Sequence, residues 1–588
     1  MILNKVYIKG FRNFKEVTVN FNKHSLIFGA NDVGKTNLIY ALRILLDRSL
    51  SDYDYELMDS DFYAYEDTKS IIIRAYLSDI TEECVVARMG GKLSDNGDLV
   101  LQYQANIHNG KISYSFYCGK SDSIDDLVEI DSPYYRKYLN LKYIGSRREF
   151  WGYINKSKNE LLLQAKEDRD EEVVEADDRL YAEIVSKLRE VDERVPKLSY
   201  IKNATEQINV ELDKLSIHNR EQQIVFDIAS SDVDKVISNV SIVSKFGEKR
   251  MLVGGEGRIN QIYLSLWASR NKNTNISNEV SIIVIEEPEV YLHPHQQREL
   301  AMYLGQTLSE QVILTTHSPF IVCEFSPNSM IRLYKRNCND TLVASDGCST
   351  IIAENFEDFG YRMSVIPAET FFSDCVILVE GPSEMILYNT LAKQLNIDLD
   401  RLNISVMSVD GVGFSTYIKI LNAMNIKWIL RTDNDIVKIA NKDKYRYAGI
   451  ERGISYLDLQ TIDQADKLVI DQNKELIHDL ADKAQIPAKI SLAASRLIAI
   501  LEKYNILIAK QGLEEDLYNS PIKQNLINHY GNALTADDII CKMKEHKAVN
   551  MYAFLKKHKT CLTLLEEDEI CLPIRKAKEY IESMYGTY

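Results

Sequence analysis

Apolar and polar positions in the first 150 residues predict a strand-rich lobe with one clear helix. Residues 1–30 contain the stretches LNKVYIKG, KEVTVNFN and HSLIFG, each of which has the pattern of a strand. Residues 35–48 carry leucine and alanine at helical spacing. Residues 68–118 return to a meander of strands with Asn-Gly and Gly-Gly turn signals. We therefore expect residues 1–150 to form an N-terminal lobe.

The middle of the chain loses this pattern and becomes charged. Between about 155 and 225 it is rich in acidic and basic residues and has few Gly or Pro. This predicts a helical insertion over residues 151–235, which would serve as an arm or a dimerisation element. A solvent-exposed helix with no partner explains the charge equally well. From 236 to 345 strands return, because VSIIVIEE (280–287) and VILTTHS (312–318) have the continuous apolar character of strands buried on both faces.

The pattern restarts after a linker at residues 346–369, so residues 370–588 are expected to form a second domain. Three apolar stretches there read as strands with helical segments between them, and this alternation favours a parallel α/β sheet. The predicted strands are 376–381, 404–411 and 427–435, and the predicted helices are 383–395, 414–424, 473–505 and 537–559. The fold class expected for both halves is therefore α/β.

Composition describes an ordinary globular protein of several domains. The chain has 588 residues, of which 45% are hydrophobic and 27% charged, and this length fits two to four domains. No apolar run is long enough to cross a membrane, and the first residues lack the pattern of a secretion signal. The nine cysteines show no paired spacing. A cytoplasmic protein with reduced thiols is therefore expected.

The net charge of −16 disfavours a protein that coats nucleic acid over its whole surface, but it does not exclude a nucleic-acid enzyme. Basic segments occur locally at 136–148, 438–452 and 542–559. A solvated face is the ordinary explanation for such a segment. For 542–559, contact with DNA is the alternative.

A phosphate-binding loop is predicted between the third strand and the first helix. Residues 29–36 (GANDVGKT) match the pattern GxxxxGK[ST], with a strand before and a helix after. Backbone N–H groups of such a loop curl round phosphates, the lysine reaches the terminal phosphates, and the threonine hydroxyl ligates Mg²⁺. The residues expected to bind the nucleotide are Asn31, Gly34, Lys35, Thr36 and Asn37.

Three later motifs support a nucleotide site. The strand at 280–287 ends in paired acids, of which Glu286 would hold Mg²⁺ through water and Glu287 would orient or deprotonate the attacking water. His317 ends another apolar strand and could sense the γ-phosphate, although a lone histidine is more often part of the core. Gly255 and Gly257 open a helix whose N-terminus would suit an anion.

Together with the segment FRNF at 11–14, these motifs resemble the ABC-type ATPases of the SMC, Rad50 and RecF group. The resemblance implies ATP sandwiched between the heads of a homodimer, with Gly255 and Gly257 acting in trans. Glu286 stands where the family usually has Asp, and the signature lacks its usual Ser-Gly-Gly core. Slow regulatory turnover of ATP and vigorous hydrolysis therefore both stay open.

Acidic residues follow each of the three predicted strands of the second domain. Glu380 and Glu384 flank a strand-to-helix turn, Asp410 ends the next strand, and Asp433 and Asp435 end the third. Asp and Asn after a strand ordinarily indicate a turn. In a parallel sheet, however, these ends lie along one edge, where carboxylates that converge repel one another unless a cation lies among them. Oxygen ligands alone suit Mg²⁺ or Mn²⁺.

The order EG…E, DGxG and DxD resembles the Toprim domain of topoisomerases, primases and certain nucleases. Both halves in this order resemble the OLD (overcoming lysogenisation defect) family, in which an ABC ATPase is fused to a Toprim nuclease. Similarity is greatest to Gabija-type nuclease subunits and retron-associated OLD effectors. The resemblance implies a further acidic motif with Glu514 and Asp516 as metal ligands, and an active-site lysine, either Lys547 or Lys544.

What the resemblance implies is an ATP-regulated, divalent-metal-dependent DNA endonuclease of anti-phage defence, which nicks or cuts duplex DNA by hydrolysing phosphodiesters with two metal ions. In this reading Lys547 neutralises charge on the reacting phosphate. Expected partners are DNA, further copies of the chain that give a dimer through the ATPase heads or a tetramer, and either a helicase-like protein or a reverse transcriptase with its retron DNA. The alternative is an ATP-driven repair or structural clamp of the SMC/RecF type with a non-catalytic Toprim scaffold.

Overall fold

The structure is a computed structural model. It describes residues 1–588 except the following: 147–157, 159–161, 164, 216–242, 247–248, 253–254, 274–278, 308–309, 337–338, 351–353, 355–364, 410, 412, 440–443, 458–460, 479, 482–485 and 587–588. The chain divides into two compact units. The first contains residues 1–146, 276–289 and 293–588, and the second contains 147–275 and 290–292. The domain boundaries expected from the sequence stay predictions.

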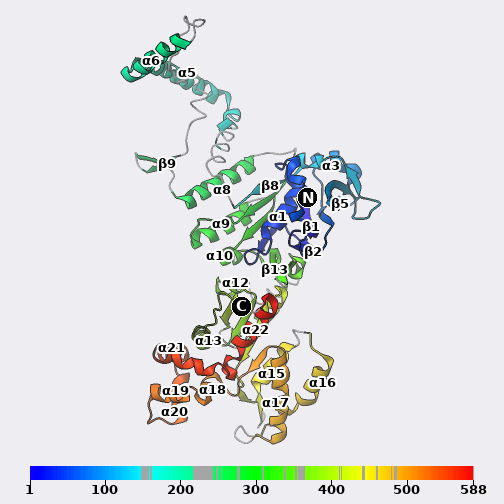
Figure 1. The fold of residues 1–588 in the computed structure, drawn as a ribbon, viewed down its shortest axis with the longest axis vertical. Coiled ribbons are helices and arrows are strands. Elements are labelled where there is room, and N and C mark those ends of the chain that lie inside the picture. Colours follow the sequence, from blue (N-terminus) through cyan, green and yellow to red (C-terminus); the bar gives the residue numbers. More distant parts are fainter. Residues whose placement is uncertain are drawn as a thin grey trace. The chain divides into compact units, whose positions relative to one another are not determined.

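Two six-stranded sheets form the N-terminal part of the first unit (Figure 1). One is antiparallel and has the order β2-β1-β4-β5-β6-β7. Its strands are β1 (Ile2–Phe11), β2 (Phe14–Asn20), β4 (Ser70–Ser78), β5 (Leu99–His108), β6 (Lys111–Gly119) and β7 (Val128–Ile130). The predicted meander is confirmed, with the β5–β6 hairpin turning at Asn109 and Gly110, both at positive φ. The short helix α3 (Glu83–Met89) interrupts it after β4.

The other sheet is mostly parallel and has the order β14-β13-β3-β12-β11-β8. Its strands are β3 (His24–Phe28), β8 (Leu139–Ile144), β11 (Val280–Glu286), β12 (Gln311–Thr316), β13 (Met330–Arg336) and β14 (Asp340–Val343). Helix α1 (Lys35–Leu46) contacts strands of both sheets and buries its apolar side chains in their common core. β3, β11 and β12 therefore end along one edge, next to the start of α1.

A four-stranded parallel sheet forms the core of the C-terminal part, in the order β16-β15-β17-β20. Its strands are β15 (Cys375–Val379), β16 (Ile404–Ser408), β17 (Lys427–Thr432) and β20 (Ile506–Ile508). Helices α13 (Pro382–Gln394) and α14 (Phe414–Ala423) connect the first three strands, and α22 (Leu572–Tyr585) packs on β15 and β17. The predicted alternation of strands and helices is confirmed.

Two long predicted helices are each interrupted. The segment 473–505 contains the end of α16 (Gln464–Asn473) and α17 (Ala488–Lys503), which starts after Pro487. Proline disfavours the helical conformation of the residue before it. The prediction of one continuous helix over residues 473–505 was therefore wrong. The segment 537–559 is split into α20 (Ala536–Lys544) and α21 (Lys547–His558) at His546, whose φ is 59°.

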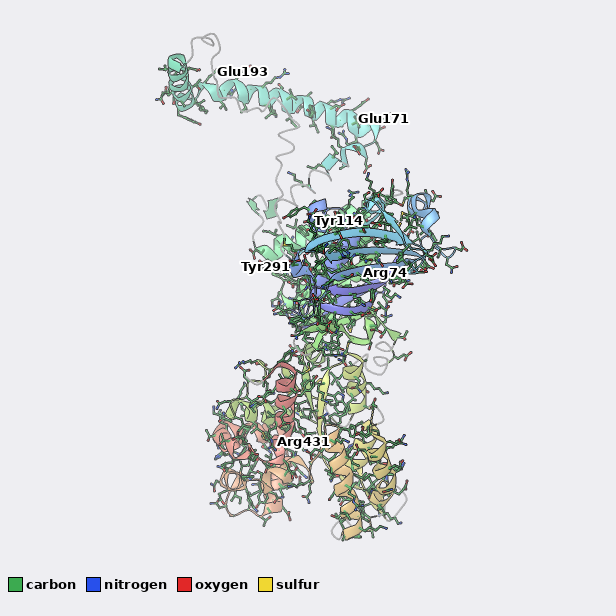
Figure 2. All side chains as sticks on the ribbon, turned by 45° about the vertical axis from the view of Figure 1, so that its right-hand side comes forward. Arg74, Tyr114, Glu171, Glu193, Tyr291 and Arg431 are labelled. Atoms are coloured by element: carbon green, nitrogen blue, oxygen red, sulfur yellow. The ribbon has the colours of Figure 1, made fainter. Side chains whose placement is uncertain are left out.

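The second unit contains the charged helices of the insertion. α5 (Glu171–Arg194) and α6 (Ser199–Leu215) are joined by a short turn that contains Pro196, and Figure 2 labels Glu171 and Glu193 near the two ends of α5. The helical character predicted from the sequence is therefore confirmed over residues 171–215, while the role of the insertion as an arm or a dimerisation element stays a prediction. The unit also contains α8 (Glu256–Asn273). Across the portions of the chain that the structure describes, no helix is both long and apolar enough to cross a membrane.

Candidate functional site

The phosphate-binding loop follows β3 and needs glycine at Gly34. Its φ is 97°, a left-handed value that favours glycine, and a Cβ there would lie 2.0 Å from Nδ2 of Asn13. Asn13 belongs to the FRNF segment and donates a hydrogen bond to the carbonyl of Val33 (3.1 Å). The FRNF segment therefore supports the loop directly, which explains why the two motifs occur together.

Lys35 begins α1 and folds back on its own loop. Its Nζ donates hydrogen bonds to the carbonyls of Gly29 (2.9 Å) and Ala30 (2.8 Å). Burial lowers the pKa of Lys35 to about 8, although the negative charge of Glu287 opposes the shift. Asn31 and Thr36 are exposed, as phosphate and metal contacts would require.

Asn37, also predicted to bind nucleotide, instead contacts the FRNF segment. Its Nδ2 donates to Oδ1 of Asn13 (2.5 Å), and its Oδ1 accepts from Arg12 (2.9 Å). Here its hydrogen bonds hold the loop's supporting segment, and its role toward a nucleotide stays a prediction.

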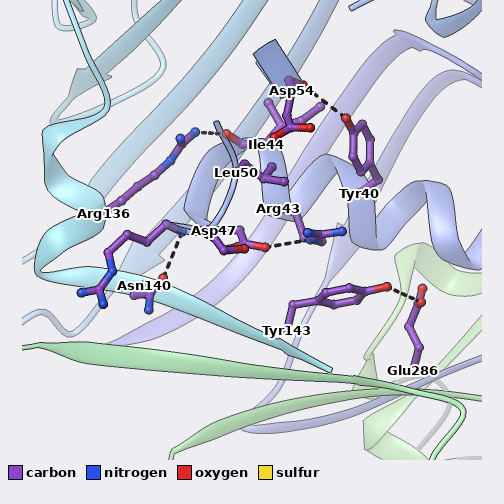
Figure 3. Close-up of polar contacts among 12 residues, drawn as sticks. Tyr40, Arg43, Ile44, Asp47, Leu50, Asp54, Arg136, Asn140, Tyr143 and Glu286 are labelled. Atoms are coloured by element: carbon purple, nitrogen blue, oxygen red, sulfur yellow. Dashed lines mark hydrogen bonds and ion pairs between the residues drawn. The ribbon is translucent and has the colours of Figure 1, made fainter. Parts of the chain in front are cut away.

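Glu286 ends β11 and is nearly fully buried. Its Oε2 accepts a hydrogen bond from the hydroxyl of Tyr143 on β8 (2.6 Å), and the pKa of Tyr143 is raised by burial and by this carboxylate (Figure 3). The guanidinium of Arg43 lies 4.0 Å from the centre of the Tyr143 ring, and Arg43 also bonds to Asp47. The sequence did not single out Tyr143, because nothing in its surroundings marks it as the neighbour of β11.

Glu287 and His317 lie together at the same sheet edge. Nε2 of His317 is 3.3 Å from Oε1 of Glu287, and its Nδ1 is 3.4 Å from Nζ of Lys35. Glu287 adopts a φ of 44°, and its backbone N–H bonds to the carbonyl of Thr315 (2.9 Å). The predicted ATPase residues are therefore brought within contact of the phosphate loop.

Glu289 is a residue that the sequence analysis left without a role. Its Oε1 accepts hydrogen bonds from the hydroxyl of Thr316 (2.6 Å) and the backbone N–H of His317 (2.7 Å), and burial raises its pKa. It thereby anchors the backbone that carries His317. Glu289 is the third acid of the Glu-Glu-Pro-Glu motif, so the sequence contained a sign of its importance. The sequence alone cannot tell a carboxylate that anchors the backbone from a solvated one.

Gly255 and Gly257 lie at the start of α8 in the second unit. Gly255 has a φ of 73°, and a Cβ on Gly257 would lie 2.4 Å from the carbonyl oxygen of Tyr291. Close packing therefore already explains glycine at 257. The role of both glycines toward a nucleotide held by another copy stays a prediction.

In the C-terminal part of the first unit, Glu380 directly follows β15, and its side chain reaches the end of β17. Its Oε1 accepts hydrogen bonds from the hydroxyl of Thr432 (2.5 Å) and from the backbone N–H of Asp433 (2.8 Å). Glu384 lies in the first turn of α13, where its Oε2 accepts from the N–H of Gly381 (3.0 Å). Asp410 lies outside the described residues.

Asp433 is the most perturbed carboxyl of this group. Burial, followed by repulsion from Glu380 and Glu384, raises its pKa to about 7. Its Oδ1 accepts a hydrogen bond from the N–H of Leu513 (3.1 Å), at the start of α18 (Leu513–Asn519). Burial also raises the pKa of Glu384. These carboxyls lie close enough to repel, which is the situation that a bound cation relieves.

Lys547 faces this acidic group from the start of α21. Its Nζ lies 3.4 Å from Oε1 of Glu514, and Glu514 is 2% exposed. Burial alone would lower the pKa of Lys547, but the charges of Glu514, Asp433 and Glu384 raise it instead. Oε2 of Glu514 is buried and has no hydrogen-bond partner among the described residues.

Asp435 and Asp516 are placed differently from the other predicted ligands. The side chain of Asp435 is 54% exposed. Asp516 forms an ion pair with the buried Arg431 (2.9 Å) and accepts from the backbone N–H of Lys510 (3.2 Å); Figure 2 labels Arg431. Its role as a ligand stays a prediction, and in this structure it neutralises Arg431.

The second lysine that the sequence left open pairs with a carboxylate that was not predicted as a metal ligand. Lys544 pairs with Glu515.

The donor set fits a divalent cation, although it is not assembled as a coordination shell. In the described portion of the chain, no three His, Cys, Asp or Glu side chains stand close enough to hold a metal as they are. The carboxylates are held instead by protein donors such as Thr432 and the N–H of Leu513. The buried oxygen of Glu514 without a partner and the raised pKa of Asp433, caused first by burial, are compatible with a cation beside them.

Comparisons with known proteins agree with this division of the chain. Residues 1–322 match the family described as AAA ATPase domain, and residues 371–435 match the TOPRIM domain described as overcoming lysogenization defect protein-like. The chain is 25% identical to the protein named Endonuclease GajA of Bacillus cereus (strain VD045), over 97% of this chain and 98% of that one. It is 24% identical to Old nuclease of Escherichia phage P2, over 74% and 77%.

Among solved structures, the C-terminal region of the Burkholderia pseudomallei OLD protein is 22% identical, with a TM-score of 0.23 over 36% of this chain and 98% of that one. The matched family covers more than half of the sequence, and the TOPRIM match falls on the strands that carry Glu380 and Asp433. The chain therefore belongs to the AAA ATPase domain family, with the TOPRIM domain of OLD-type proteins in its second half.

Proposed function

We propose that this protein is an ATP-regulated, divalent-metal-dependent DNA endonuclease of an anti-phage system, of either the Gabija or the retron type. The names of the two relatives, an endonuclease and a nuclease, support the reaction class. The observation that carries the proposal is the group of carboxyls at the end of the parallel sheet, faced by Lys547. A scaffold would gain nothing from burying Glu514 and Asp433 so close to other acids.

In the proposed site, Glu380, Glu384, Asp433 and Glu514 would hold Mg²⁺ or Mn²⁺, with Asp435 and Asp516 as outer candidates. A bound divalent cation would supply an activated water and charge for the leaving oxygen. Lys547 lies where its ammonium can offset charge on the reacting phosphate. Glu384 and Asp433 must be ionised to serve as ligands, and the cation supplies the charge that favours this form.

The N-terminal half would bind ATP at the phosphate loop, with Thr36 and Glu286 toward Mg²⁺ and with Glu287 and His317 toward the γ-phosphate. Lys35 would exchange its bonds to Gly29 and Ala30 for phosphate oxygens. We propose that this binding regulates cleavage, and that two copies meet through these halves. Partners would be DNA and a second component of the defence system, either helicase-like or a reverse transcriptase with its DNA.

The test is cleavage of supercoiled plasmid in Mg²⁺ or Mn²⁺ by the wild type and Asp433→Asn. The matched control is Asp471→Asn, because Asp471 is an exposed carboxylate paired with Lys474 (2.8 Å), far along the chain from every proposed ligand. The wild type and Asp471→Asn should cut the plasmid, and Asp433→Asn should not. Cutting by all three proteins would remove the proposed site, and cutting by none would favour the clamp alternative.

A further inference from the structure

Arg452 brings a positive charge into the proposed metal site. It lies on α15 (Ala448–Leu457), and its Nη2 is 3.7 Å from Oε1 of Glu380 and 3.6 Å from Oδ2 of Asp435. The same nitrogen donates hydrogen bonds to the hydroxyl of Thr432 (3.2 Å) and the carbonyl of Asp433 (3.1 Å). The guanidinium is therefore held where β17 ends.

Backbone packing determines this placement. A Cβ on Gly449 would lie 2.3 Å from the carbonyl oxygen of Asp433 and 2.7 Å from Cα of Asn434, so only glycine allows the first turn of α15 to approach so closely. The N–H of Ala448 bonds to the carbonyl of Asp435 (2.8 Å). Residues three apart share one face of a helix, so Arg452 lies on the face that Gly449 presses against the strand end.

One donor of the guanidinium has no hydrogen-bond acceptor among the described residues. Nε of Arg452 is buried and finds no hydrogen-bond partner within the described part of the chain. A guanidinium carries five N–H donors in a planar fork that matches the oxygens of a phosphate. Burying such a donor without a partner is costly, which indicates that an acceptor completes the site.

We propose that Arg452 acts first as a counter-charge and then as a contact for the substrate phosphate. Without metal, it holds Glu380 and Asp435 in place and competes with a cation for them. When a divalent cation occupies these carboxylates, the guanidinium is released to bind the phosphate at the cleavage point, across from Lys547. The second half of this proposal rests on the nuclease function proposed above. The basic segment 438–452 thereby contributes to the site through its last residue.

The first experiment measures equilibrium Mn²⁺ binding by the electron paramagnetic resonance signal of free Mn²⁺, without nucleotide or DNA. Arg452→Met removes the competing charge, so it should bind Mn²⁺ about tenfold more tightly than the wild type. The matched control is Arg446→Met. Arg446 pairs with Glu451 in the same segment, and its substitution removes the same net charge as Arg452→Met. It should stay within about twofold of the wild type, because the charge of Arg446 is paired with Glu451, which is not a proposed metal ligand.

The second experiment measures plasmid cleavage at saturating Mn²⁺. Arg452→Met should raise KM for DNA about tenfold or more, as expected for loss of a charged phosphate contact. Arg452→Lys keeps the charge and loses the planar fork, so it should bind Mn²⁺ like the wild type but still show a raised KM for DNA. This variant keeps the proposal testable if Arg452→Met fails to fold.

Opposite directions of the two effects distinguish the proposal from structural damage, which would weaken both. The proposed role of Arg452 as a counter-charge would be overturned if folded Arg452→Met bound Mn²⁺ more weakly than the wild type. It would also be overturned if Arg446→Met raised the affinity for Mn²⁺ as much as Arg452→Met. An unchanged KM in both Arg452 variants would overturn the phosphate contact. If the wild type binds Mn²⁺ but cuts no DNA, the nuclease proposal fails. The comparison of Mn²⁺ affinities still tests whether Arg452 competes with the cation for the carboxylates.

Discussion

Nζ of Lys547 lies 3.4 Å from Oε1 of Glu514, so the first residue of α21 faces the buried carboxyl that α18 brings to the end of the parallel sheet. Lys544, three residues earlier, pairs with Glu515. Of the two lysines that sequence spacing leaves open, Lys547 is the one that lies against a proposed metal ligand, and we propose it as the residue that would contact the reacting phosphate.

Replacing Lys547 should therefore abolish most cleavage. We expect Lys547→Ala to lower the rate of plasmid cutting by about 100-fold or more, the cost typical of removing one charge-stabilising group from an active site. Lys544→Ala is the matched control and should change the rate by less than about threefold, because Lys544 pairs with Glu515, which is not a proposed metal ligand. The rates are measured by single-turnover gel assay at saturating Mg²⁺. The reverse order of the two effects would reassign the lysine.

Nucleotide binding should regulate cleavage without being part of it. Lys35→Ala removes the side chain that we propose binds the phosphates, so the effect of ATP on plasmid cutting should disappear while metal-dependent cutting persists. Lys9→Ala, a change to an exposed lysine on β1, should retain the full response to ATP. A folded Lys35→Ala protein that cuts no DNA would show instead that ATP binding is obligatory.

The affinity for ATP should fall as the pH rises above about 8. Burial lowers the pKa of Lys35 to about 8 from the ordinary value near 10.5. Below this pH the ammonium is charged and attracts phosphates, and above it the neutral amine does not. A fluorescent ATP analogue titrated between pH 7 and 9.5 should lose up to about tenfold in affinity per pH unit above 8. Lys35→Ala should show no such loss, and a flat wild-type profile would contradict the prediction.

Arg332 should stabilise the packing of β13 against the segments that precede β15 and β17. It lies on β13, is 3% exposed, and donates hydrogen bonds to the carbonyls of Phe371 (2.9 Å), Ser373 (2.8 Å), Met424 (3.1 Å) and Asn425 (3.3 Å). These carbonyls directly precede β15 and β17, the strands that end at Glu380 and Asp433.

We expect Arg332→Met to lower the free energy of unfolding by about 3 kcal/mol, because it leaves several buried carbonyls without donors. The comparison is Arg336→Met, an exposed arginine on the same strand, which should change stability by less than about 0.5 kcal/mol. Thermal unfolding followed by circular dichroism measures both. Equal melting temperatures for the two variants would show that the carbonyls find other donors.

The parallel sheet of the C-terminal domain was predictable, because its first three strands are short apolar runs that are each followed by an acid; the order in which they lie was not predicted. β15, β16 and β17 lie side by side as expected, so the acids that follow β15 and β17 reach one edge. The helix break at His546 was not predictable, since both α20 and α21 continue the helical spacing across it. That break lets Lys547 begin a new helix facing Glu514.

Contacts between distant elements account for most of what the sequence did not show. Arg452 lies in a segment whose basic composition is ordinary for a solvated face, and only the close approach of Gly449 to β17 reveals its place. Tyr143 and Glu289 likewise gain their roles from neighbours on other strands, Glu286 and His317. Residue type and spacing predict which chemistry is available, whereas the partners of each side chain follow from packing.

The central claim is that the carboxyls at this sheet end hold a divalent cation. Crystals grown with Mn²⁺ and measured at the manganese absorption edge test it most directly, because anomalous scattering locates the ion itself. The account predicts an anomalous peak about 2 Å from carboxylate oxygens of Glu380, Asp433 and Glu514. No peak there, in crystals of a protein that cleaves DNA with Mn²⁺ in solution, would contradict it.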